Sequence, residues 1–381
     1  MQKRIRIVSI GIILIIILIS IILNNNTNKK HIFKKDGILY ALSLDGKSIT
    51  SFPSKGLYKA NVSCAGADGR WLYDEWKLAI ENITSDDVTC DIKFETISKT
   101  YLNDYIISLA GSTQGTGQVV NENGYRYEGK NPNNYIWFNN EYWRIIGVFD
   151  SASHGQSNKN LVKIIRADVL DGLAWDKSNT NNWNTSSLKS LLNGAYYNAQ
   201  DGTASGYCYG YSTTATANCD YTKKGIQSGY RSMIAKVTWH LGGYSSYSAT
   251  TSAFYEYERG TTVYSGRPTS TTGYIGLIYP SDYGYSVLAS SCARTTNLDS
   301  YNSATCAGQS WLYGKGYEWT LSPYSSNSIH VFILSNNGNV SVYIANYGYA
   351  VRPVLYLDAS VYKIDGDGSL KNPYIVGMWY A

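Results

Sequence analysis

Short apolar runs separated by polar, glycine-rich turns cover most of the chain after its first 36 residues, and this pattern predicts β-strands. The two clearest runs are residues 135–149, YIWFNNEYWRIIGVF, and residues 350–357, AVRPVLYL, where aromatic and β-branched residues are bounded by Asn, Gly and Asp. The long stretch between them is dominated by Tyr, Ser, Thr, Gly and Asn. We therefore expect one domain whose first and last strands pair and whose middle is displayed on loops.

Two stretches in that middle part show helical periodicity instead. Residues 185–198 place apolar side chains three and four positions apart on one face, and residues 229–241 repeat this spacing ahead of Gly242, which favours a helix end. Strand patterns return afterwards and continue to a closing hairpin at the C-terminus. Early helices followed by antiparallel strands predict an α+β domain.

Residues 37–98 have a different pattern, with predicted strands at short spacing and polar turns between them. Cys64, Trp76 and Cys90 are typical of a core in which a disulfide packs on a Trp side chain, but fewer strands fit than an immunoglobulin sandwich needs. We predict a small disulfide-tied β domain. A short helix and a linker follow in residues 99–118, and the main domain covers residues 119–381.

The first 23 residues predict a membrane anchor. A basic start precedes an apolar run from Ile7 to Leu23, and no small-residue cleavage motif follows it. An uncleaved signal anchor would hold the protein in the cell membrane by a single pass, with the bulk of the chain extracellular. Four lysines in the polar stalk that follows, residues 24–36, oppose that orientation.

Charge and composition exclude one class of partner. The net charge is +5, but residues 1–35 contain seven Lys or Arg and no acidic residue, so the remaining 26 basic residues face 28 acidic ones. This balance leaves no basic surface of the kind that binds nucleic acid, and we expect no nucleic-acid partner. Only 16% of the residues are charged while 36 are Tyr, a composition that favours an extracellular surface.

Six cysteines lie in three couples that are local in sequence, and none forms the C-x-x-C pattern of zinc or redox sites. Beyond a membrane anchor the surroundings favour oxidised cysteines. Each couple falls within one predicted domain or loop, so we predict three sequential disulfides: Cys64–Cys90, Cys208–Cys219 and Cys292–Cys306. The predicted disulfides agree with an extracellular location.

Four segments carry a resemblance: EYWRIIGVFD, LVKIIRADVL, NNWNTSSLKSLLNGAYYN and YAVRPVLYL. They resemble a family of uncharacterised surface-domain proteins of Gram-positive bacteria, in which a W-R-x-I/L strand precedes a W-x-x-S-x-L-[KR]-x-x-L-N helix and a C-terminal V-R-P strand. The closing turn is also similar to the end of formylglycine-generating-enzyme-like domains, a branch of the C-type-lectin-like fold. The resemblance covers roughly residues 120–376. It implies a C-type-lectin-like main domain and a bacterial membrane for the anchor.

Several motif residues are expected to hold the fold rather than to act on a ligand. These are Trp143, Arg144, Trp183, Arg352 and Pro353. Arg144 and Arg352 lie in strands that are otherwise apolar, and a buried guanidinium can satisfy several loop carbonyls with its fixed donors. A functional role for the two arginines is the alternative.

Candidate catalytic and metal-binding residues are few. Glu256 and Glu258 could form an acid and base pair, but at this spacing they do not share a helix face, and solvated charges are the expected state. Asp365 and Asp367 could begin a calcium loop, but the closing Glu is missing and a tight hairpin turn is the simpler explanation, so calcium is the weaker alternative. His240 is expected to cap or pack at a helix end. We expect no other metal or cofactor.

The spacing of Cys292 and Cys306 departs from the C-x-x-x-x-C copper pair of formylglycine-generating enzymes. This departure favours a structural disulfide over oxidase chemistry. Since no catalytic constellation stands out, we expect the protein not to be an enzyme. Tyr, Ser and Gly together have the composition of binding surfaces, because Tyr offers a large rigid contact area with a polar tip.

Cell-surface recognition or adhesion is therefore the predicted function. The predicted contact residues for an extracellular glycan or protein ligand are Tyr244, Tyr247, Tyr255, Tyr257, Tyr283 and Tyr285. One alternative is an enzyme on a formylglycine-generating-enzyme-like scaffold that acts on cell-envelope substrates, and another is a structural envelope protein. Tyrosines that only fill the core of a fold with few leucines would remove the binding hypothesis.

Overall fold

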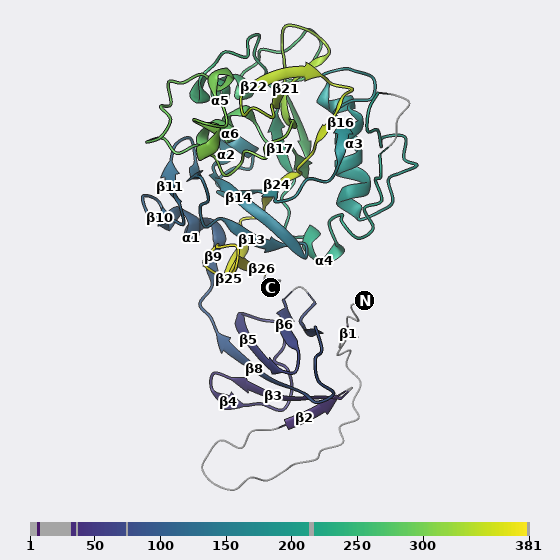
Figure 1. The fold of residues 1–381 in the computed structure, drawn as a ribbon, viewed down its shortest axis with the longest axis vertical. Helices are drawn as coiled ribbons and strands as arrows, with labels where there is room; N and C mark the ends of the chain where they lie inside the picture. The colour runs from purple at the N-terminus through teal and green to yellow at the C-terminus, as the bar shows by residue number, and fades with distance from the viewer. Residues whose placement is uncertain (1–5, 8–31, 36, 74, 213–216, 379–381) are drawn as a thin grey trace. The chain divides into compact units, whose positions relative to one another are not determined.

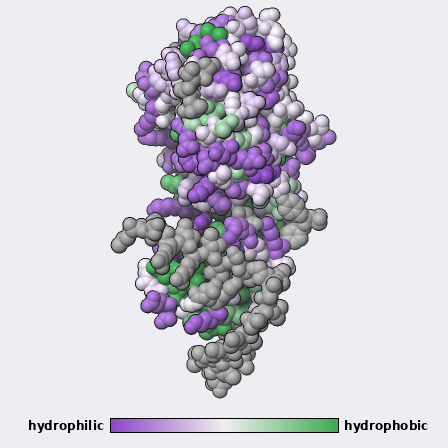
Figure 2. Space-filling model, turned by 90° about the vertical axis from the view of Figure 1, so that its right-hand side faces the viewer, coloured by the Kyte–Doolittle hydropathy of each residue, from purple (hydrophilic) through white to green (hydrophobic). Residues whose placement is uncertain are grey.

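Strands outnumber helices and the helices are short, so the fold is α+β as predicted. The computed structural model describes residues 6–7, 32–35, 37–73, 75–212 and 217–378 (Figure 1). The chain divides into two compact units, with the boundary between Thr100 and Tyr101. Each unit has a hydrophobic core of its own. On the face shown in Figure 2 the surface is mostly hydrophilic to neutral, with smaller hydrophobic patches.

Eight strands are described in the first unit: β1 (Arg6–Ile7), β2 (Ile32–Lys35), β3 (Ile38–Leu44), β4 (Lys47–Ser48), β5 (Tyr58–Ala65), β6 (Asp68–Leu72), β7 (Lys77–Glu81) and β8 (Val88–Thr96). They form one sheet in the order β2–β3–β8–β5, with β4 beside β3, and another in the order β1–β7–β6. β3 and β8 run parallel, whereas the other described pairs of this unit are antiparallel.

Alternation along β8 builds the first core. Every second residue from Val88 to Phe94 is buried, and the residues between them are more exposed. The ring of Trp71 lies 5.0 Å from that of Phe94, at an angle of 88°. Cys64 of β5 is directly opposite Cys90 and bonded to it, so the disulfide joins neighbouring strands of one sheet. The predicted disulfide-tied β domain is thus present, without the inter-sheet bond of an immunoglobulin sandwich.

Most of the predicted anchor and stalk lie outside the described residues. Of the predicted anchor, only Arg6 and Ile7 are described, and they pair with β7. Of the predicted stalk, residues 32–35 are described and form a strand, so the stalk prediction is wrong for this part. No helix in the described part of the chain is both long and apolar enough to cross a membrane. The anchor stays a prediction.

The second unit is built on an eleven-stranded sheet. Its strands are β9 (Thr100–Tyr101), β10 (Thr113–Gln114), β11 (Gly117–Asn121), β12 (Tyr125–Gly129), β13 (Tyr135–Phe138), β14 (Glu141–Phe149), β15 (Leu161–Arg166), β19 (Ile275–Gly276), β24 (Val354–Leu357), β25 (Val361–Asp365) and β26 (Tyr374–Met378). β14 pairs with β12 and β13 and also with β15, which in turn pairs with β24. The strands of Trp143 and Val354 therefore share a sheet as predicted, but β15 separates them and they do not pair directly.

A five-stranded sheet has the order β16–β23–β20–β21–β22. Its strands are β16 (Gly172–Ala174), β20 (Glu318–Pro323), β21 (His330–Leu334), β22 (Val340–Ile344) and β23 (Gly348–Ala350). A separate pair consists of β17 (Val237–His240) and β18 (Ser270–Gly273). At the C-terminus, β25 and β26 form the predicted closing hairpin, and β26 also runs parallel to β13.

The described helices are α1 (Leu102–Ser108), α2 (Ser151–His154), α3 (Ser187–Leu191), α4 (Ser228–Arg231), α5 (Thr251–Arg259) and α6 (Pro280–Ser286), with the π-turn η2 (Leu192–Tyr196) and the 3₁₀ turns η1 (Trp183–Thr185), η3 (Leu298–Ser300) and η4 (Ala307–Gln309). The helix predicted over 185–198 is present as α3 and η2, capped by Ser186, whose side chain accepts the Lys189 N–H at 3.1 Å.

The helix predicted over 229–241 is mostly wrong. α4 ends at Arg231, and residues 237–240 form β17, where Val237 and Trp239 are buried and the residues between and after them are half-buried. The same apolar residues satisfy a period of two, and pairing with β18 decides the outcome. His240 is consequently a strand residue rather than a helix cap.

The domain boundary also differs from the prediction. α1 belongs to the second unit, where Leu102 and Ile106 are buried in the main core. The segment predicted as a linker forms the hairpin of β10 and β11, and β11 pairs with β12 along its length. Residues 99–118 are therefore part of the second unit from Tyr101 onward, not a spacer.

Candidate functional site

Arg352 holds the end of the fold together. Its guanidinium donates to both carboxylate oxygens of Glu318, at 2.8 and 2.7 Å, and to the Leu312 carbonyl at 2.7 Å. All of this ion pair is buried. The structural interpretation of Arg352 fits these contacts, because they use the guanidinium on the protein's own groups.

Arg144 is used in the same way. It donates to the Asn134 side chain at 2.7 Å and to the Pro132 carbonyl at 3.3 Å. Its guanidinium also lies 4.2 Å from the ring centroid of Tyr135 and 4.7 Å from that of Trp311. Burial lowers the pKa of Arg144 to about 10. The side chain is enclosed by the fold rather than presented to a ligand.

The remaining motif residues are buried as well. Trp143 and Trp183 have 0% and 2% of their surface exposed, and the Trp183 ring lies 4.9 Å from that of Trp175. Pro353 is buried and its carbonyl accepts the Arg166 N–H at 3.0 Å. These residues lie in the core as packing elements.

Two of the six predicted contact tyrosines are wrong. Tyr283 and Tyr285 have only 0% and 4% of their surface exposed. Both belong to α6, every residue of which is buried, and Tyr283 donates its hydroxyl to the Gly338 carbonyl at 2.6 Å. They are core residues because α6 is enclosed by the rest of the unit.

The other four lie nearer the surface, but only Tyr247, at 49%, is well exposed. Tyr244 and Tyr257 stack on each other with ring centroids 3.9 Å apart. The Tyr255 ring lies 3.5 Å from the Arg259 guanidinium. Three of these four rings are therefore engaged in contacts within the protein.

A denser group of surface tyrosines lies elsewhere, on the five-stranded sheet and the loops beside it. We name it the tyrosine face, and its members are Tyr211, Tyr317, Tyr343, Tyr347 and Tyr349. Tyr211, Tyr317 and Tyr343 are 50%, 40% and 37% exposed, and the other two are half-buried. None of these five tyrosines was among the residues predicted to contact a ligand.

The members of the tyrosine face touch one another in a chain. Tyr347 is the centre, with its ring 4.8 Å from that of Tyr211, 4.9 Å from Tyr343 and 5.3 Å from Tyr349. Tyr317 and Tyr349 stack at 4.9 Å and an angle of 20°. Contacts between rings fix their orientation, so the surface is preformed.

Local structure explains how these rings meet. Tyr343 is on β22 and Tyr349 on β23, and the short turn between the two strands carries Tyr347. Tyr317 directly precedes β20, whose first residue, Glu318, pairs with Ala350 of β23. The Y-x-x-x-Y-x-Y spacing of residues 343–349 was the signal in the sequence that could have identified this surface.

A second group of polar residues is buried in the main core. We name it the ionic core: Arg126, Lys163, Glu258, Arg259 and Asp282. Asp282 binds Arg126 at 3.0 Å and Lys163 at 2.5 Å, and all three side chains are about 1% exposed. Glu258 accepts hydrogen bonds from the backbone N–H of Ser281, at 2.9 Å, and from the Ser281 hydroxyl.

The expectation that Glu258 is solvated is wrong, since it is 1% exposed, whereas Glu256 is exposed as predicted. Both lie on α5, and their spacing puts them on different sides of the helix. Burial raises the pKa of Glu258 to about 7. Lys163, a single charge within the apolar strand LVKIIR, was the signal in the sequence for this group.

The weak calcium candidate has the geometry of a turn. The Asp367 carboxylate accepts the Ser369 N–H at 2.9 Å, and Gly366 and Gly368 adopt φ of 87° and 79°. No group of three or more His, Cys, Asp or Glu that could hold a metal ion is found among the described residues. The Cys292–Cys306 disulfide is formed, as are the other two predicted ones.

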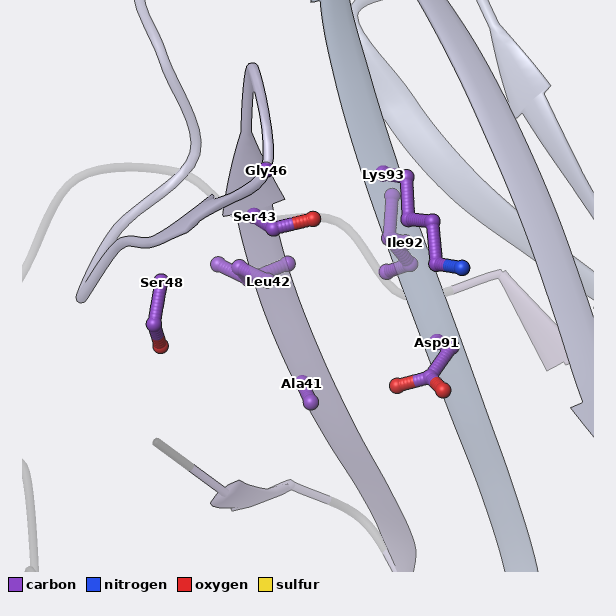
Figure 3. A pocket seen from close by; sticks show the side chains of 8 residues that line it. All are labelled: Ala41, Leu42, Ser43, Gly46, Ser48, Asp91, Ile92 and Lys93. Carbon is purple, nitrogen blue, oxygen red and sulfur yellow. The ribbon is translucent and has the colours of Figure 1, made fainter. Parts of the chain in front are cut away.

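A small depression of about 250 Å³ lies on the first unit (Figure 3). It is lined by Ala41, Leu42, Ser43, Gly46, Ser48, Asp91, Ile92 and Lys93, which come from β3, β4, β8 and the turn after β3. Its lining mixes apolar groups with one carboxylate and one ammonium group. These residues do not converge on a recognisable constellation, so the tyrosine face is the better candidate.

Comparison of the chain with known protein families, with curated proteins and with solved structures gave no match.

Proposed function

We propose that this protein recognises a glycan outside the cell through the tyrosine face. The observation that carries the proposal is the cluster of five mutually contacting tyrosines, three of them at least 37% exposed. An apolar ring face can stack on the C–H face of a sugar, while the phenol hydroxyl can bond to sugar hydroxyls. Because the rings already hold one another, little side-chain freedom is lost on binding.

The same proposal includes the C-type-lectin-like fold and the membrane anchor. What supports the fold is that β13, near the start of the second unit, and β26, near its end, are neighbours in one sheet, while the strands and loops between them carry the tyrosines. What supports an extracellular location is three disulfides, since disulfides persist in oxidising compartments. The apolar run at residues 7–23 supports the anchor.

A glycan array probed with the full-length protein tests the proposal, followed by titration of the best glycan. Replacing Tyr343 or Tyr211 by Ala should weaken binding by about 1–3 kcal/mol each, as for exposed aromatic contacts. Tyr247→Ala is the matched control, because Tyr247 is equally exposed but belongs to the predicted loop surface.

The outcomes separate three hypotheses. Loss of binding in the Tyr343 and Tyr211 variants alone supports the tyrosine face. Loss in the Tyr247 variant alone would return the site to the 244–285 loops. No glycan binding, together with capture of a purified surface protein that depends on Tyr343, would make the ligand a protein and overturn the glycan proposal.

A further inference from the structure

Lys163 and Asp282 meet deep inside the second unit although 119 residues separate them in the chain. Lys163 lies on β15 and Asp282 on α6, and the Lys163 Nζ is 2.5 Å from the Asp282 Oδ2. Both side chains are about 1% exposed. An amine and a carboxyl group are thus held in contact, away from water, by two separate elements.

Aromatic rings surround the amine. The Lys163 Nζ lies 4.5 Å from the ring centroid of Tyr279 and 5.7 to 5.8 Å from those of Phe149, Trp239 and Tyr356. The ring faces can stabilise the ammonium, whereas removal from water disfavours it, so the protein's own groups decide how readily Nζ gives up a proton. Burial lowers the pKa of Lys163 to about 8, so the neutral amine that can attack a carboxyl carbon is reached more readily here than at an exposed lysine.

We propose that Lys163 and Asp282 are joined by an intramolecular amide bond that the folded protein forms by itself. The contact distance supports this directly. Nζ is within hydrogen-bond distance of the carboxyl group whose carbon it would attack, so the two reacting groups are already neighbours. Because the fold holds the amine and the carboxyl group side by side, the reaction needs no diffusional encounter between them and loses little entropy.

The reaction balances without any other reactant. Nζ passes one proton to Oδ2 and its lone pair attacks Cγ of Asp282. The C–O bond to Oδ2 then breaks, and Oδ2 leaves as water with a second Nζ proton. An ammonium and a carboxylate thereby become a neutral amide and one water, and no oxidant or reductant takes part.

Arg126 is placed to assist. Its Nη1 donates to Asp282 Oδ1, at 3.0 Å, the oxygen that stays in the amide and that takes up negative charge while Nζ is attached. Phe149 and Tyr285 lie on the guanidinium, each with its ring centroid at 4.5 Å, and hold it in place. Although burial would raise the pKa of Asp282, Lys163 and Arg126 keep it below its ordinary value.

An exposed pair of the same residue types provides the contrast. Lys159 and Asp358 approach only to 3.8 Å and are 42% and 27% exposed. Water keeps both groups charged there, and a protonated amine is not a nucleophile. The inferred bond is therefore specific to Lys163 and Asp282.

The test is mass spectrometry of the full-length wild-type protein. Its intact mass should be lower by one water than the mass of the sequence with three disulfides. After reduction and trypsin digestion, cleavage at Lys163 should be blocked, and peptide 160–166 should be found joined to peptide 260–294. Cleavage after Lys163 with both peptides free would overturn the proposal, as would a water loss confined to peptide 260–294, which indicates a cyclic imide.

Two variants complete the test. Lys163→Arg should lose the joined peptide, whereas Lys159→Arg, which alters the exposed pair, should keep it. A joined peptide that persists in Lys163→Arg would assign the link to another amine and overturn the proposal. Because the decisive result comes from the wild-type protein, it does not depend on the stability of either variant.

Discussion

Two tyrosine-rich segments of the second unit have nearly the same composition and opposite surroundings. In residues 279–285 the three tyrosines have 1%, 0% and 4% of their surface exposed, and their neighbours include the ionic core. In residues 343–349 the first tyrosine is 37% exposed, the other two are half-buried, and all three rings contact one another. The two segments are equally rich in tyrosine, but the rings are buried in the first and partly exposed in the second.

The difference comes from what accompanies the rings. Residues 279–285 include Asp282, which two buried cations and the Tyr279 N–H hold inside the unit. A buried charge needs such partners, and the rings around it exclude water. Residues 343–349 carry no charged residue and span the end of β22, a turn and β23, so their rings remain partly at the surface. Tyrosine content alone therefore does not identify a binding surface.

Among the substitutions that test this comparison, removal of the Asp282 side chain should cause the largest loss of stability. Asp282→Ala leaves both Lys163 and Arg126 buried without their partner and also removes the proposed amide link, and we expect the free energy of unfolding to fall by about 5 kcal/mol, at the upper end for loss of one partner of a buried charge. Denaturant unfolding measures it. Asp358→Ala, in the exposed pair with Lys159, should cost no more than about 1 kcal/mol. Equal losses in the two variants would show that burial does not distinguish them.

Truncation of a buried tyrosine should come next. Tyr283→Ala empties a fully buried site and removes the hydroxyl that the Gly338 carbonyl accepts. We expect a loss of about 3–4 kcal/mol, within the range for aromatic residues cut back to Ala. Thermal and denaturant unfolding check this value, and a loss below about 1 kcal/mol would contradict the core assignment of α6.

The sequence allowed good prediction where one pattern dominated. Buried strands such as Glu141–Phe149 combine aromatic and β-branched residues with polar ends, and the local cysteine couples left few sensible pairings. Prediction failed where two patterns fitted the same residues, as in 237–240, where pairing with β18 made a strand of an apparent helix. Local periodicity does not contain that partner.

Prediction of the candidate site from the sequence failed for a similar reason. Tyr317 and Tyr349 stack only because Glu318 and Ala350 pair in the sheet, a long-range contact that composition does not show. Likewise, Lys163 could be noticed within an apolar strand, but its partner Asp282 lies on α6, far along the chain, and nothing in the sequence links the two. Chemistry assembled by tertiary contacts is not visible in a single sequence.

The pH dependence of stability sharpens the comparison further. In the folded protein the pKa of Glu258 is raised from 4.5 to about 7, so the folded state binds more protons than the unfolded state between these values. Stability from this group is therefore greatest at low pH and falls as pH rises towards 7, by about 2–3 kcal/mol. Denaturant unfolding from pH 4.5 to 7 should show that the wild type loses this amount relative to Glu258→Gln. The exposed Glu256→Gln variant should follow the wild type, and parallel curves for all three would refute the prediction.

Truncation on the tyrosine face should have the smallest effect on stability. Tyr343→Ala removes an edge-strand side chain that is 37% exposed, and its ring contacts are with other surface tyrosines. We expect the free energy of unfolding to change by no more than about 0.5 kcal/mol, as for other surface substitutions. Unfolding of this variant beside Tyr283→Ala gives the comparison directly. If Tyr343→Ala were to lose several kcal/mol, its ring would be a structural element like that of Tyr283, and any loss of glycan binding in this variant would reflect misfolding. If stability is kept while binding is lost, the ring is free to serve a ligand, because the fold does not need it.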